Sequence, residues 1–156
     1  IKKRSLNIKL IDPVKDYDGS TYAKVNAVAE KATTATTTGL VNGDTFDSSV
    51  ISGTYGYIDA ADNFIASPDV SSNKVKYTGL LEALGDGAGN YTLNVSDSTQ
   101  NLVPAADDSF VGGGTINRLK ITDSNLKALL AKVILMLRIR PKMAAVQSRL
   151  RIISKS

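Results

Sequence analysis

Two carboxylates near the N-terminus, Asp16 and Asp18, stand in the run Asp-Tyr-Asp-Gly-Ser. Alternating acidic residues followed by a glycine begin the loops that surround a calcium ion with oxygen ligands. Such a loop needs a bidentate acid at its twelfth position, and counting from Asp16 that position is Ala27. The run therefore predicts a structural turn, and we expect no metal site there.

The glycine-rich run GDGAGN, residues 85–90, resembles a loop that cradles phosphate. Phosphate loops follow a strand and open a helix, and a P-loop continues with Lys and then Ser or Thr. Here the alternating run YTLNV, residues 91–95, follows instead, and alternation is typical of a strand. We expect a turn at this place and no cofactor.

Groups for acid–base catalysis are scarce. The sequence contains no histidine and no cysteine, which excludes a Ser-His-Asp triad, a disulfide framework and a thiolate metal site. Paired carboxylates occur at Asp59/Asp62 and at Asp107/Asp108, in segments that predict solvated loops. Because no apolar pocket would raise their pKa, general-acid work is disfavoured. We expect a protein that is not an enzyme.

Two sequons for N-glycosylation, Asn90-Tyr91-Thr92 and Asn94-Val95-Ser96, lie close together. They make Asn90 and Asn94 candidate sites of sugar attachment.

Short strands joined by turns would position these residues. Residues 5–11 and 22–28 alternate apolar and polar side chains, and Asp18-Gly19 supplies the turn between them. Further strands are predicted within residues 48–58, 74–81 and 91–95, and residues 32–38 as a strand end or exposed edge. The tyrosines expected in the core are Tyr17, Tyr55, Tyr77 and Tyr91. The pattern predicts an all-β fold, either a small antiparallel Ig-like sandwich or a grasp-like sheet.

Three motifs in the first hundred residues resemble the YDG/MBG-type repeats of bacterial surface adhesins, among them haemagglutinin-like, two-partner-secreted proteins. The motifs are a YDG-[ST]-T turn, a GLVNGD step and a GNYTL strand. The residues that carry the likeness are Tyr17, Asp18, Gly19, Thr21, Gly43, Asp44, Asn90, Tyr91 and Leu93. The resemblance implies a repeated, extracellular module on the bacterial cell surface.

The charge is divided along the chain. Residues 1–114 hold 9 Lys/Arg and 14 Asp/Glu, a net −5, whereas residues 115–156 hold 10 Lys/Arg and Asp123 alone, a net +9. We expect a β domain at residues 1–98, a Gly/Pro/Asp linker at 99–114 and a basic tail at 115–156, whose strand and helix could be the start of a following repeat. The first residue, Ile1, is not Met, so we expect a piece of a longer protein.

The basic tail shows a helical period. Asp123 or Ser124 would cap a helix that stops before Pro141, while residues 146–153 fit a helix or a strand. The apolar residues of that period are Leu126, Leu129, Leu130, Val133, Ile134 and Leu137. Residues 133–137 are too few to cross a bilayer. The helix could pack on the β domain, bind an anionic membrane or nucleic acid, or be foreign to the module.

These observations favour a non-catalytic adhesive or spacer module of a large secreted or surface-anchored adhesin. Its partners would be a host-cell or neighbouring-cell ligand and adjacent repeats of the same chain. No nucleic acid is expected, because the tail has no aromatic residue for base stacking. The alternative is a β scaffold whose basic helix binds anionic membrane or nucleic acid; membrane contact by the tail is the less favoured reading.

Overall fold

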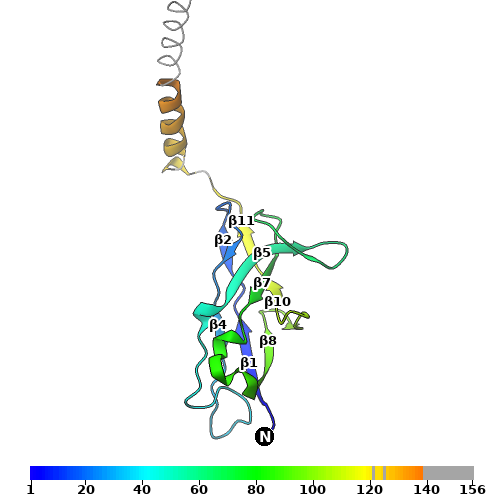
Figure 1. The fold of residues 1–156 in the computed structure, drawn as a ribbon. Coiled ribbons are helices and arrows are strands. Elements are labelled where there is room, and N and C mark those ends of the chain that lie inside the picture. The colour runs from blue at the N-terminus through cyan, green and yellow to red at the C-terminus, as the bar shows by residue number, and fades with distance from the viewer. Residues whose placement is uncertain (121, 125, 139–156) are drawn as a thin grey trace, which may run out of the picture. The chain divides into compact units, whose positions relative to one another are not determined.

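Two compact units make up the chain in a computed structural model, which describes residues 1–120, 122–124 and 126–138. The first unit is Ile1–Leu119 and the second is Lys120–Ser156. The first unit contains the strands and two 3₁₀ helices, and the second begins with an α-helix (Figure 1).

The first sheet has the strand order β4-β1-β8-β9. Its central strand β1 (Arg4–Leu10) pairs antiparallel with β4 (Ala27–Ala29) and parallel with β8 (Tyr91–Ser96). The edge strand β9 (Asn101–Leu102) pairs antiparallel with β8. The parallel pairing matches Arg4 with Tyr91 and continues to Lys9 and Ser96, so the N-terminal strand lies inside the sheet.

The second sheet is antiparallel throughout, with the order β10-β7-β5-β3 and β6 added beside β5. Its strands are β3 (Tyr22–Ala23), β5 (Ser52–Ile58), β6 (Phe64–Ala66), β7 (Lys74–Thr78) and β10 (Phe110–Gly113). The long strand β5 is therefore the one that holds this sheet together.

A third, two-stranded ladder joins the early and late parts of the unit. Strand β2 (Val14–Asp16) pairs parallel with β11 (Thr115–Asn117). β2 follows β1 after three residues, and β11 follows β10 after Gly114 alone. The ladder thus continues the chain from β1 on one side and from β10 on the other.

The 3₁₀ helices precede strands β5 and β8. Helix η1 (Ser48–Val50) is capped by Asp47, whose Oδ1 accepts a hydrogen bond from the Ser49 N–H. Helix η2 (Glu82–Asn90) has a break at Gly85, where φ is 54°. The glycine-rich run at residues 85–90, expected as a turn, lies within η2. Short 3₁₀ segments commonly serve as connectors, as this one does between β7 and β8.

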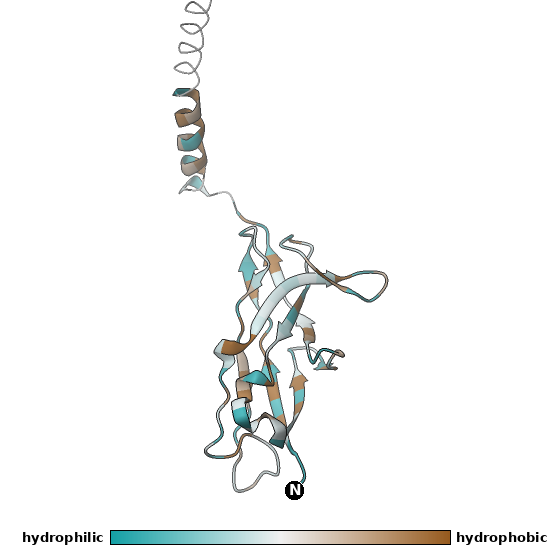
Figure 2. Cartoon of the chain, viewed as in Figure 1, coloured by the Kyte–Doolittle hydropathy of each residue, from teal (hydrophilic) through white to brown (hydrophobic). Residues whose placement is uncertain are grey.

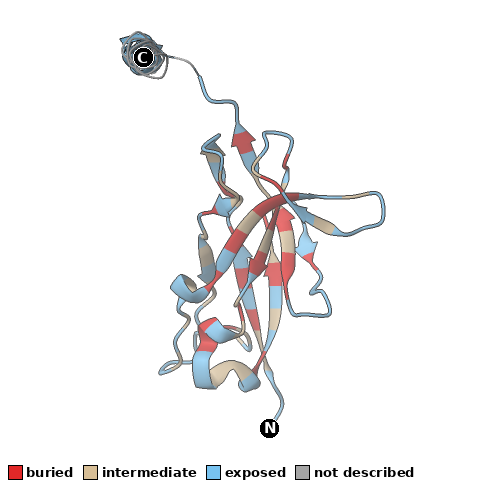
Figure 3. Cartoon of the chain, turned by 45° about the horizontal axis from the view of Figure 1, so that its top comes forward, coloured by how far each residue is buried: buried red, intermediate tan, exposed pale blue. Residues whose placement is uncertain are grey.

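One core lies between the two larger sheets. Alternate residues of β1, namely Leu6, Ile8 and Leu10, are almost completely buried, as the period-2 pattern predicts. They share a cluster with Val75 and Tyr77 of the second sheet. Buried positions run along the strands of both sheets in Figure 3, and the same strands show apolar stretches in Figure 2.

The all-β class of the first unit is confirmed, with one helix in the C-terminal part. The pairing is mixed, however, because β1–β8 and β2–β11 are parallel. Residues 22–28, expected as one strand, form β3 in the second sheet and β4 in the first. Residues 32–38 adopt turns and bends instead of a strand, beside an isolated bridge between Lys31 and Leu40. Local alternation does not reveal that the chain changes sheets.

The segment 99–114 differs from the expected linker, because it contains β9 and β10. Leu102 and Phe110 from this segment belong to the core cluster. Burial of these side chains ties the segment to the β unit, although its Gly and Pro content is typical of a linker. Likewise β11, expected within the tail, pairs with β2, and the unit ends at Leu119.

Three of the four tyrosines expected in the core are buried: Tyr55, Tyr77 and Tyr91 are 1–3% exposed. The expectation for Tyr17 is wrong, since its side chain is 41% exposed. Tyr17 follows β2, and its backbone N–H donates to the Asn117 carbonyl. Its backbone therefore serves the β2–β11 ladder while the ring faces solvent.

The second unit is helical over residues 123–124 and 126–138, which confirms the predicted helix within the described range. The Leu126 N–H donates to the Thr122 carbonyl at 2.8 Å, so Thr122 stands at the N-cap position, one residue before the expected Asp123. The predictions for Pro141 and for residues 146–153 concern residues outside the part that the structure describes. Among the helices that the structure does describe, none is long and apolar enough to cross a membrane.

Candidate functional site

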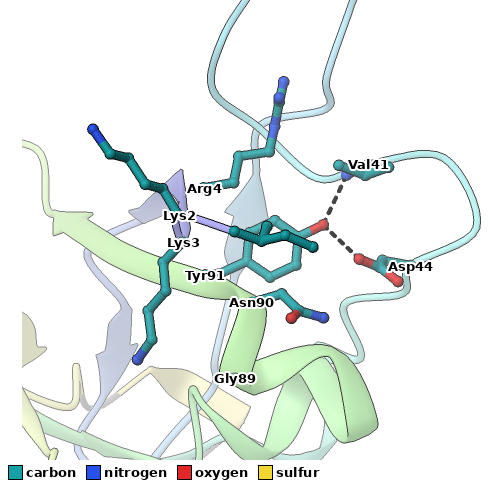
Figure 4. A pocket seen from close by; sticks show the side chains of 9 residues that line it. Lys2, Lys3, Arg4, Val41, Asp44, Gly89, Asn90 and Tyr91 are labelled. Atoms are coloured by element: carbon teal, nitrogen blue, oxygen red, sulfur yellow. Dashed lines mark hydrogen bonds between the residues drawn. The ribbon is translucent and has the colours of Figure 1, made fainter.

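The second and third motifs meet at one buried tyrosine. The Tyr91 hydroxyl donates to Asp44 Oδ2 at 2.6 Å and accepts from the Val41 N–H at 2.9 Å (Figure 4). Asp44 lies 47 residues before Tyr91 in the sequence. The second motif thus supplies the acceptor and the third motif the donor of a hydrogen bond that joins a loop to the start of β8.

Strand and turn geometry place these groups. Tyr91 is the first residue of β8, and its neighbour in the sheet is Arg4. The Arg4 guanidinium donates to the carbonyls of Gly39 and Thr38, each at 2.8 Å. Gly39 has a φ of 101°, and a Cβ there would stand 2.7 Å from the backbone of Lys31 and Ala32. Only glycine suits this position. The hydrogen bonds from Arg4 fix the loop here, and the same loop continues to Asp44, which contacts Tyr91.

A pocket of about 500 Å³ lies beside the Tyr91–Asp44 hydrogen bond. It is lined by the first four residues of the chain and by residues of the two motifs. Figure 4 shows Tyr91, Asp44, Asn90 and the basic side chains around it. Burial, followed by the hydrogen bond to Asp44, raises the pKa of the Tyr91 hydroxyl. A raised pKa keeps the hydroxyl protonated at neutral pH, as its hydrogen bond to Asp44 requires.

The first motif forms a separate corner after β2. The Lys15 ammonium donates to Asp18 Oδ1 at 2.8 Å and to the carbonyl and hydroxyl of Ser20 at 2.8 and 3.0 Å. It also lies 5.2 Å from the centre of the Tyr55 ring, within cation–π range. Asp18 Oδ1 accepts a further hydrogen bond from the Ser20 N–H at 2.9 Å. The Lys15 ammonium is thus held by side-chain and backbone oxygens of the turn itself.

Electrostatics at this corner follow from these contacts. The hydrogen bond from Lys15, followed by those from Ser20, lowers the pKa of Asp18 to about 2. Gly19 takes a φ of 77°, which is the turn conformation that the sequence predicts for it. The Thr21 carbonyl accepts from the Tyr55 N–H at 2.7 Å and links the turn to β5.

The predicted motif residues therefore fall into two places. Tyr17, Asp18, Gly19 and Thr21 lie between β2 and β3, whereas Asp44, Asn90 and Tyr91 line the pocket together with the first four residues of the chain. Gly43, with a φ of 99°, forms part of the turn before Asp44. Leu93 is half-buried and packs against the core. In the part of the chain that the structure describes, no hydrogen bond joins the two groups.

Both sequon asparagines are exposed. Asn90 ends η2 and borders the pocket, while Asn94 lies within β8 and donates from Nδ2 to Asn7 Oδ1 at 3.3 Å. Sugar attachment at either position stays a prediction.

Sequence reasoning missed Asp97, a carboxylate that is only 7% exposed. Its oxygens accept hydrogen bonds from the N–H groups of Thr99, Gln100 and Gly113 at 2.9–3.0 Å. Burial raises the pKa of Asp97, but the N–H donors outweigh it and leave a lowered pKa. The run Asp-Ser-Thr at 97–99 was the available signal, since such runs form side-chain capped turns.

Polar groups in both places are thus engaged in holding the fold. Among the described residues, no three acidic side chains are grouped closely enough to hold a metal ion. Comparison with known protein families, with curated proteins and with solved structures finds no match to this chain.

Proposed function

We propose that residues 1–119 are a non-catalytic spacer and attachment module of a secreted or surface-anchored bacterial adhesin. The observation that carries this proposal is the placement of the two ends of the β unit. The N-terminus and β11 lie at opposite ends of the unit (Figure 1). A module with its entry and exit at opposite ends can be joined in series without the chain turning back, as a stalk requires.

The chemistry of the motif residues supports the same proposal. Tyr91, Asp44, Lys15 and Asp18 donate and accept within the module and fix its loops. The motifs that resemble adhesin repeats are therefore explained by folding alone. Attachment would fall to exposed loop side chains, with a host-cell or neighbouring-cell ligand as the partner and the bacterial cell surface as the location.

Surface display tests this proposal. The chain is placed between an outer-membrane anchor and a tip domain of known ligand on a non-adherent bacterium, with a matched flexible linker as the control. We expect the module to hold the tip farther from the cell than the linker does. A second arm without the tip measures retention on a layer of host cells. A display that changes neither reach nor retention contradicts the proposal.

The tail helix supports a second candidate function, attachment to an anionic membrane surface. Within the second unit the apolar side chains of residues 126–138 are exposed by 46–63%. At roughly 100° per residue, Lys127, Arg138 and Lys132 flank a broad apolar face centred near Leu126. Apolar faces bordered by cations are typical of helices that lie in the membrane interface. Residues 120–156 carry 9 Lys/Arg against Asp123, a net +8.

Vesicle binding tests this second candidate with a matched pair of variants. Leu130 belongs to the apolar face and Leu135 lies opposite it, and their side chains are 52% and 59% exposed. We expect Leu130→Glu to weaken binding of the full chain to phosphatidylserine vesicles far more than Leu135→Glu does. Equal effects, or equal binding to neutral phosphatidylcholine vesicles, would rule out an amphipathic, charge-assisted mode.

A further inference from the structure

The chain enters and leaves the β unit through strands that are paired in parallel. β1 is paired with β8 over six positions, and β2 is paired with β11 over three. At the ends of the shorter ladder, the Thr115 N–H donates to the Pro13 carbonyl at 2.9 Å and the Tyr17 N–H to the Asn117 carbonyl at 2.8 Å. β11 ends at Asn117, two residues before the end of the unit at Leu119.

Parallel pairing decides how a stretching force acts on these ladders. In each pair, one strand is connected to the N-terminus through its first residue, and the other is connected to Leu119 through its last. Tension between the two ends of the unit therefore pulls the paired strands in opposite directions along their length. The hydrogen bonds between parallel strands are evenly spaced, so they share this load and do not open one at a time.

Side-chain packing supports the shorter ladder against sliding. Ile116 is 2% exposed and belongs to the core. The Tyr55 hydroxyl donates to the Thr115 carbonyl at 3.2 Å. The chain between β10 and β11 lies so close to the second sheet that a Cβ on Gly114 would stand 2.5 Å from Val75 Cγ2 and 3.0 Å from the Tyr55 ring. β11 is thus fixed by the core on one side and by β2 on the other.

From this arrangement we infer that the two parallel ladders, β1–β8 and β2–β11, form a mechanical clamp that resists force applied along the module. The inference deepens the proposed spacer function and rests on it, because only a module held between two anchored ends bears such a load. An adhesin stalk under flow would be loaded in this direction.

The direction of pulling provides the decisive test. Since the chain has no cysteine, pairs of introduced cysteines can serve as specific handles on the full chain. One variant carries Lys3→Cys and Leu119→Cys and loads the ladders lengthwise. The other carries Tyr17→Cys and Leu119→Cys and pulls β2 and β11 apart from the same end. All three side chains are exposed.

We expect the unfolding force in single-molecule stretching to be roughly twofold or more higher for the first pair, because its hydrogen bonds break together. Equal forces in the two directions would overturn the clamp. Both variants keep the same strands and core, so we expect them to have the same melting temperature. Thermal melting of both variants checks that a difference in unfolding force does not come from a difference in folding stability. This comparison requires no host cell or ligand, so its failure is separate from failure of the adhesive function.

A backbone variant locates the clamp. Thr115→Pro removes the N–H that bonds to Pro13, and Thr115→Ala keeps it and changes only an exposed side chain. We expect a loss of unfolding force in Thr115→Pro that Thr115→Ala does not show. An unchanged force in a folded Thr115→Pro chain contradicts a clamp at β2–β11. If this variant does not fold, the comparison of pulling directions decides alone.

Discussion

At the scale of single residues, the Tyr91 hydroxyl is the group on which the loop around Asp44 depends. Tyr91→Phe removes one donor and leaves Asp44 Oδ2 and the Val41 N–H without their partner. We expect a loss of about 1–2 kcal/mol in the free energy of unfolding, since the acceptor is charged and half-buried. Urea unfolding measures it. The control is Tyr57→Phe, at a tyrosine that is 40% exposed, and a similar loss there would contradict the assignment.

The Lys15–Asp18 pair makes a prediction about acid. The pKa of Asp18 is lowered from 3.8 to about 2 in the folded chain. Because this pKa is lower in the folded chain than in the unfolded chain, ionised Asp18 stabilises the fold at pH values above its ordinary pKa. This contribution disappears as the pH falls from about 4 to 2. We expect Lys15→Met to return the Asp18 pKa toward 3.8, as followed by the NMR shift of its carboxyl carbon. An unchanged pKa would show that the Ser20 donors suffice.

At the scale of elements, the contact between β5 and β6 depends on the absence of a side chain. A Cβ on Gly56 would clash with the Ile65 carbonyl and stand 2.6 Å from the Phe64 ring. We expect Gly56→Ala to destabilise the fold by about 1–3 kcal/mol in urea unfolding. At Gly89 an added Cβ would meet no other atom within 4 Å, so Gly89→Ala should change the free energy of unfolding little. Equal effects would mean that the close approach of β6 is not required.

The strands also show how far local sequence reaches. The alternation in residues 74–78 and 91–95 predicts β7 and β8 correctly, because one face of each is buried. The same reasoning failed at residues 22–28, where the chain changes sheets, and at β9 and β10, where few residues show any alternation. Pairing partners depend on contacts that are distant in sequence, and periodicity does not encode them.

At the scale of the whole molecule, the limits of the β unit lead to a truncation test. We expect a chain of residues 1–119 to melt within a few degrees of the full chain, since its core cluster is complete. A chain of residues 1–98 loses β9, β10 and β11, including Phe110 and Ile116, and should not fold. Circular dichroism melting measures both. A cooperative transition in the 1–98 chain would show that residues 1–98 fold without β9, β10 and β11, as the sequence predicted.

The amino-acid sequence by itself determined the β character of the first unit, the burial of Tyr55, Tyr77 and Tyr91, and the helix after residue 122. These properties follow from side-chain periodicity and type, which are local. Only the tertiary structure decided that Asp44 meets Tyr91 and that β1 pairs in parallel with β8 and β2 with β11. Such contacts join residues that only the shared core brings together, so chain topology, and not local pattern, selects them.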